Sequence, residues 1–269
     1  MVWTPKCFQH VSTVTGQGNK ILTEIKQRSR VYKEVLQVAP NTDTLPTLPC
    51  YLTELVIGKC CAAYAQTVVV LPMFPKLRRI EIGNGSFANS YALRVEKNPV
   101  LRSVVIGSDC FTRNTKSEDG LDILACPQLL SLTVGAGSFT STKRLTLKDL
   151  EQLSEFDYHP SALQSCTTLF FFHCDMLNTV SFPPESFKQV RILRLDTMAE
   201  LQTIVFGENS CVGVKDEEPS FSCMGGNCWG VSSLDCPSLK LIDFGDNIHS
   251  MSLSSYSLFY LKSWAGLGT

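Results

Sequence analysis

The chain has 269 residues, of which 44% are hydrophobic and 18% are charged, and its formal net charge is −1. These proportions are typical of a folded protein with a sizeable core and exclude a disordered chain. The balanced charge provides no excess of basic side chains for nucleic acid or for an anionic membrane surface.

The sequence shows neither a secretory signal nor a membrane-spanning segment. The start, MVWTPKCFQHVSTVTG, lacks the basic segment and the apolar run of a secretory signal. The apolar runs are far shorter than the ~20 residues of a membrane span. Twelve cysteines are too few for a disulfide scaffold of this length. We therefore expect a cytoplasmic protein with reduced thiols and no membrane insertion, unless the chain is a fragment of a longer protein, as its ending LKSWAGLGT suggests.

Residues 1–44 differ in pattern from the rest of the chain. Their apolar residues have an irregular helical spacing that ends at Pro40, and these residues are Ile21, Ile25, Val31, Val35 and Val38. Because the end of a repeat stack needs a cover, we predict that 1–44 form an N-terminal cap, partly helical.

Residues 45–269 contain a repeat. The pattern is LRRIEIGNGSF at 77–87, LRSVVIGSDCF at 101–111 and LLSLTVGAGSF at 129–139. From Leu52 to Leu261 the intervals between leading leucines are 25, 24, 28, 24, 24, 24, 38 and 22 residues. A fixed period of this size is typical of a solenoid. We predict about eight units of ~24 residues, with insertions near 112–120 and 212–230.

The pattern of apolar residues in each unit predicts two short strands. Apolar residues alternate after each leading leucine, and a second alternating pair precedes it by eight and six residues, as Leu93 and Val95 precede Leu101. A glycine usually follows the first strand, where we expect a positive φ to turn the chain. These glycines are Gly58, Gly83, Gly107, Gly135, Gly207 and Gly245, while His159 and Pro183 replace them in two units. A Phe four residues later is spaced to fill the interior at Phe87, Phe111, Phe139 and Phe187.

These patterns resemble a known family. LRVEKNPVL at 93–101 is similar to the core of leucine-rich repeats, and the IG-x-x-S/C-F element resembles the BspA-like branch of bacteria and protists. The resemblance implies a right-handed, mainly β solenoid of short parallel strands with little helix, used for protein–protein contact. Which of the two strands lines the concave face stays open.

Candidates for chemistry are poorly supported. Four cysteines could form a zinc knuckle, but their spacing lacks the paired hooks of structural zinc sites: Cys211, Cys223, Cys228 and Cys236. The four histidines have no partnered Ser or Cys in a catalytic arrangement, and TGQGNK at 15–20 lacks the spacing of a phosphate loop. We expect no metal, no cofactor and no enzymatic activity.

The outward face of the second strand is the better candidate. Because Leu169 and Phe171 take the inward positions, alternation turns Phe170 and Phe172 outward. The residues that we expect to bind a partner are Phe170, Phe172, Arg94, Glu96, Lys148, Arg194 and Asp196, beside Asp122 and Thr146. A packed side chain or cap covering the two rings is the alternative. We expect a recognition or scaffold module that binds another protein; alternatives are a cell-surface adhesin fragment and the targeting arm of a larger multidomain enzyme.

Overall fold

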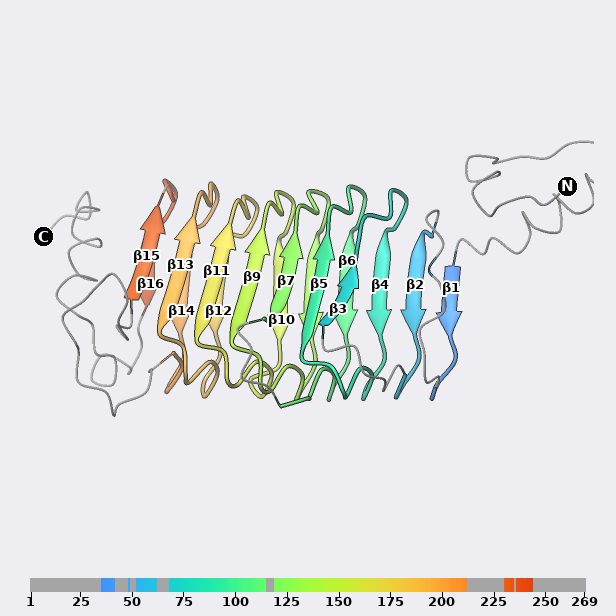
Figure 1. Ribbon diagram of the computed structural model, residues 1–269. Helices are drawn as coiled ribbons and strands as arrows, with labels where there is room; N and C mark the ends of the chain where they lie inside the picture. Colours follow the sequence, from blue (N-terminus) through green and yellow to red (C-terminus); the bar gives the residue numbers. More distant parts are fainter. Residues whose placement is uncertain are drawn as a thin grey trace, which may run out of the picture.

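The described residues form a β-solenoid of stacked parallel strands. The computed structural model describes residues 35–41, 48, 52–61, 68–114, 119–211, 230–234 and 236–243. No helix occurs in this part of the chain. Figure 1 shows two layers of arrows that run in opposite directions, as expected when each coil supplies one strand to each layer.

The strands form three sheets in which all neighbours are parallel. Sheet A contains β1 (Val35–Val38), β2 (Glu54–Ile57), β4 (Arg79–Ile82), β6 (Ser103–Ile106), β8 (Ser131–Val134) and β10 (Glu155–Tyr158). Sheet B contains β3 (Val68–Leu71), β5 (Ala92–Glu96), β7 (Leu121–Leu124), β9 (Arg144–Lys148), β11 (Thr168–Phe172), β13 (Ile192–Asp196) and β15 (Gly230–Leu234). Sheet C contains β12 (Thr179–Phe182), β14 (Thr203–Phe206) and β16 (Leu241–Asp243).

The register of the sheets follows the repeat in the sequence. Ser131 of β8 pairs with Ser103 of β6 and with Glu155 of β10, so the aligned residues are 28 and 24 positions apart. Thr203 pairs with Leu241 across the longest interval of 38 residues. The intervals between leading leucines therefore predicted the register wherever strands of consecutive coils pair, including the two places where the chain is longer.

The core lies between the layers and is apolar at every level. Alternate residues of the strands are buried, and the rings of Phe87, Phe111 and Phe139 stack at centroid distances of 5.0 and 4.5 Å. Each buried phenylalanine contributes about 1.5–3 kcal/mol relative to an exposed one. Leu163 takes the corresponding place in the next coil, and it shares the positive φ of the three phenylalanines. The predicted role of these positions as interior fillers is confirmed.

The glycines at the strand ends serve a different purpose from the one we predicted. Positive φ occurs at Gly85 and Gly137 and at none of the strand-end glycines in the described residues. The reason for glycine is close approach, because a Cβ on Gly83 would lie 2.7 Å from the backbone of Gly58 and one on Gly135 would lie 2.5 Å from the backbone of Gly107. Stacking at strand spacing leaves no room for a side chain there.

Polar side chains in the turns join successive coils. Asn98 accepts a hydrogen bond from the backbone N–H of Phe74 at 2.9 Å and donates to the carbonyl of Glu96 at 2.9 Å. The Ser138 hydroxyl donates to the Gly107 carbonyl at 2.7 Å and accepts from the N–H of Cys110 at 2.9 Å. These bonds satisfy buried backbone groups that would otherwise lack partners.

The N-terminal part of the described chain extends sheet A. Val35 and Val38, which lie in the segment with helical spacing, belong to strand β1 and pair with β2. The β-branched residues of VLQV favour a strand, and the edge of β2 supplies its partner. Most of the predicted cap, residues 1–34, and most of the insertion at 212–230 lie outside the described residues, as do Cys223, Cys228 and Gly245.

Candidate functional site

The outward row of sheet B brings most of the predicted binding residues onto adjacent strands. Phe170 of β11 pairs with Thr146 of β9 and with Arg194 of β13. Phe172 pairs in the same way with Lys148 and with Asp196. We call these residues, together with Arg94, Glu96 and Asp122 on β5 and β7, the sheet B ridge.

The centre of the ridge is an aromatic pair held by an arginine. The rings of Phe170 and Phe172 lie 5.6 Å apart between centroids, and the guanidinium carbon of Arg194 lies 5.3 Å from the centroid of Phe172. Arg194 also forms an ion pair with Asp196 at 3.1 Å. Both phenylalanines are half-buried. Arg194 of the neighbouring strand therefore packs on Phe172, Phe172 packs on Phe170, and part of each ring stays exposed.

The other end of the ridge is a charge cluster. Asp122 is 4% exposed and accepts from Arg94 at 3.2 Å and from Arg144 at 3.1 Å. Arg94 and Glu96 are separated from the aromatic pair by strands β7 and β9. The predicted residues thus share one face but form two groups.

A break in the opposite layer is a second candidate, and the sequence analysis did not predict it. Sheet A ends at β10 and sheet C begins at β12, although the two strands belong to consecutive coils. Sheet B is continuous at the same level, since β11 pairs with both β9 and β13. We call the interruption between Glu155–Tyr158 and Thr179–Phe182 the seam.

Pro183 removes one hydrogen bond of the ladder at the seam. In the other coils the residue after the strand donates its N–H to the preceding coil, as Gly135 does to Ile106 at 2.8 Å and Gly207 does to Phe182 at 2.7 Å. Pro183 occupies the same position but has no N–H. The N–H of Phe187 likewise forms no bond to the preceding coil among the described residues, whereas Leu163 bonds to Ser138 at 2.9 Å.

Aromatic side chains occupy the seam. Tyr158 and Phe156 align with the fully buried Val134 and Leu132 of β8 but are larger. The Tyr158 ring packs against Phe187 at 4.9 Å, and its hydroxyl donates to the Ser181 carbonyl of β12 at 3.1 Å. Burial of the ring raises the pKa of Tyr158 far above its usual value, against the opposing hydrogen bond with Ser186. The hydroxyl is therefore protonated at neutral pH and serves as a donor.

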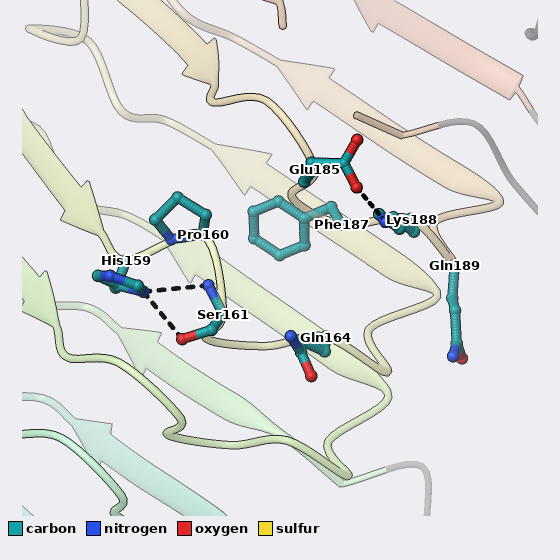
Figure 2. Close-up of a pocket in the computed structure, with 8 residues that line it drawn as sticks. All are labelled: His159, Pro160, Ser161, Gln164, Glu185, Phe187, Lys188 and Gln189. Carbon is teal, nitrogen blue, oxygen red and sulfur yellow. Dashed lines mark hydrogen bonds and ion pairs between the residues drawn. The ribbon is translucent and has the colours of Figure 1, made fainter. Parts of the chain in front are cut away.

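The corner that follows the seam contains a pocket of about 500 Å³ (Figure 2). One wall is His159, Pro160, Ser161 and Gln164, and the other is Glu185, Phe187, Lys188 and Gln189. The N–H of Ser161 donates to Nδ1 of His159 at 3.2 Å, and the Ser161 hydroxyl oxygen lies 2.8 Å from the same nitrogen.

The facing wall of the pocket is charged. Glu185 forms an ion pair with Lys188 and accepts from Asn209 at 2.7 Å, which holds the pKa of Glu185 below its usual value.

The buried thiols Cys110 and Cys126 fit structural roles. Cys126 lies at a turn and donates to the Leu124 carbonyl at 3.4 Å, and burial raises its pKa to about 11. Cys110 is also buried, with its pKa raised to about 11 by the same cause. Within the described ranges, no group of three or more His, Cys, Asp or Glu residues is placed to hold a metal ion. No helix in the same ranges is long and apolar enough to cross a membrane.

The comparisons with known proteins find no match: no family model, no curated protein and no solved structure is similar to this chain at the level searched.

Proposed function

We propose that this chain is a non-enzymatic recognition module that binds another protein through the sheet B ridge. The observation that supports this proposal is the half-buried pair Phe170 and Phe172, with Arg194 over the Phe172 ring and the charged residues Lys148 and Asp196 on the neighbouring strands. Rigid aromatic residues and arginine are enriched at the energetic centres of protein interfaces, while surrounding charges select the partner.

The fold supports an extended interface. The residues that recur between coils are buried or pack against the next coil, and the residues that vary on sheet B point outward in aligned rows. A solenoid of this kind binds through many adjacent surface positions and needs no deep cavity. We further propose that the chain is a leucine-rich repeat protein of the BspA-like type. Support comes from the 24-residue register and from the turn position of Asn98 in LRVEKNPVL.

Affinity capture tests this function. The immobilised chain is exposed to an extract of its source organism, in parallel with a Phe170→Asp, Phe172→Asp variant and with a Met73→Asp, Leu130→Asp control. The control residues are exposed hydrophobics outside the ridge, at 58% and 45% exposure. We expect a protein that the wild type and the control retain and the ridge variant does not. Equal retention by all three would sink the proposal.

A further inference from the structure

The edge of β10 that faces the seam presents unpaired backbone groups. In a parallel ladder, alternate residues direct both their N–H and their C=O to the same neighbouring strand. Glu155 bonds to Leu130 at 3.1 Å and His159 bonds to Val134 at 2.9 Å, so the odd-numbered residues of β10 face β8. The backbone groups of Phe156 and Tyr158 therefore face the seam.

The edge of β12 is the counterpart. Thr203 donates to Asn178 at 3.1 Å and Gly207 donates to Phe182 at 2.7 Å, so the even-numbered residues of β12 face β14. The backbone groups of Thr179 and Ser181 face the seam, and both residues are exposed. In the described chain, no backbone hydrogen bond joins β10 to β12. Two strand edges thus face each other, and such edges are templates for a further strand.

The two edges are separated by the width of a side chain. Paired strands lie about 4.8 Å apart, and a carbonyl of one then meets an N–H of the other. At the seam the Ser181 carbonyl is instead met by the phenol of Tyr158, a side chain that is longer than this spacing. The corner pocket of about 500 Å³ lies between the same two coils, at the corner that directly follows β10 and β12. The open space at the seam is only about 10 Å³, because the Tyr158 ring and its apolar neighbours fill it, so a further strand enters only when the Tyr158 ring rotates out.

We propose that the seam binds an extended peptide segment of a partner protein, which adds as a strand between β10 and β12. An extended backbone offers donors and acceptors at the spacing that the edges of Phe156, Tyr158, Thr179 and Ser181 require. Such a peptide takes the place of the Tyr158 ring and leaves the seam through the corner pocket.

Charge specifies the chemistry of the peptide. The outward side chains of β10 are Glu155 and Asp157, which are exposed and form no ion pair within the described ranges. The outward side chains of β12, Thr179 and Ser181, are neutral. Every second side chain of a strand lies on the same face as its neighbours on the next strand, so opposite charges at these positions attract each other. The peptide therefore carries Lys or Arg at two positions separated by one residue.

The seam and the ridge are independent sites, because they lie in opposite layers of the solenoid. A probe of the seam is the fluorescein-labelled peptide Thr-Lys-Val-Lys-Thr-Val-Thr, and its binding to the full chain is measured by fluorescence anisotropy. Two control peptides replace the first Val by Pro or both Lys by Glu. The Pro peptide lacks one backbone donor, and the Glu peptide reverses the charge.

We expect saturable binding that the Pro and Glu peptides each weaken by about tenfold or more. A Glu155→Lys, Asp157→Lys protein is expected to bind the probe peptide about tenfold more weakly than the wild type does. A Tyr158→Ala protein is expected to bind the probe peptide more tightly. The Phe170→Asp, Phe172→Asp protein is expected to bind the probe like the wild type, which separates this test from that of the ridge. Equal binding of the Pro peptide, or no binding by either wild type or Tyr158→Ala, would overturn the proposal.

Discussion

Because successive coils approach closely at Gly83, we expect replacement by alanine to destabilise the protein much more at Gly83 than at the nearby Gly85. A Cβ on Gly83 would lie 2.7 and 2.8 Å from the carbonyl carbon and oxygen of Gly58, where ordinary contacts are 3.4 Å or more. Gly83 also donates to Ile57 at 2.8 Å, so the two coils cannot separate by the required ~0.7 Å without weakening this bond. Overpacking against the backbone, together with a weakened hydrogen bond, gives a loss of about 3 kcal/mol in the free energy of unfolding for Gly83→Ala.

Gly85→Ala is the matched control. Its φ is +70°, and the one close contact of its Cβ would be the Sγ of Cys60 at 3.1 Å, the end of a side chain, while the Cys60 backbone lies 3.9 Å or more away. The expected loss in the free energy of unfolding is then about 1 kcal/mol, which is the strain of an alanine backbone with a positive φ. Urea unfolding followed by circular dichroism measures both variants against the wild type. Equal losses, or a loss below about 1 kcal/mol for Gly83→Ala, would show that stacking distance is not the reason for glycine at this position.

Other parts of the structure predict measurable effects. Ser138→Ala removes the hydroxyl that bonds two buried backbone groups, so we expect a loss of about 2 kcal/mol in urea unfolding, against almost none for the outward Ser103→Ala. In the native protein, iodoacetamide followed by mass spectrometry is expected to label the exposed Cys60 well before the buried Cys110 and Cys126. The pKa of each of these two buried thiols is raised from 9.0 to about 11. Unfolded thiols ionise first, so the stability that the thiols contribute is complete below pH 9 and is expected to fall between pH 9 and 11. Urea unfolding across this range that shows no decrease would contradict the burial of the two thiols.

The periodic features of the fold could be predicted from the sequence because they depend on local alternation and on spacing. The intervals between leading leucines gave the register between strands, and alternation placed Phe170 outward and Phe171 in the core. The 24-residue interval from Phe170 to Arg194 predicted that these two residues are aligned, as they are. The guanidinium of Arg194 lies over Phe172 instead, and this diagonal contact depends on the side-chain conformation, which the interval does not determine.

The seam could not be predicted from the repeat, because it arises where the repeat fails. Its signal was the replacement of glycine by His159 and Pro183 in two consecutive units. The missing N–H of Pro183 indicates a lost hydrogen bond only when the structure shows that the preceding coil accepts from this position. The effect of the large Tyr158 ring on the packing of the two coils can be recognised only when its neighbour in the next coil, the aromatic residue Phe187, is known. Both facts concern contacts between coils and are not visible in one unit.

The affinity of the captured partner for the ridge tests the proposed function most directly. Purified partner is titrated against the wild type, the Phe170→Asp, Phe172→Asp variant and the Met73→Asp, Leu130→Asp control by isothermal titration calorimetry. Loss of an aromatic interface centre costs at least 2 kcal/mol, so we expect binding about 30-fold weaker for the ridge variant and unchanged for the control. A change of less than about threefold in the ridge variant would contradict the assignment of the sheet B ridge as the partner-binding surface.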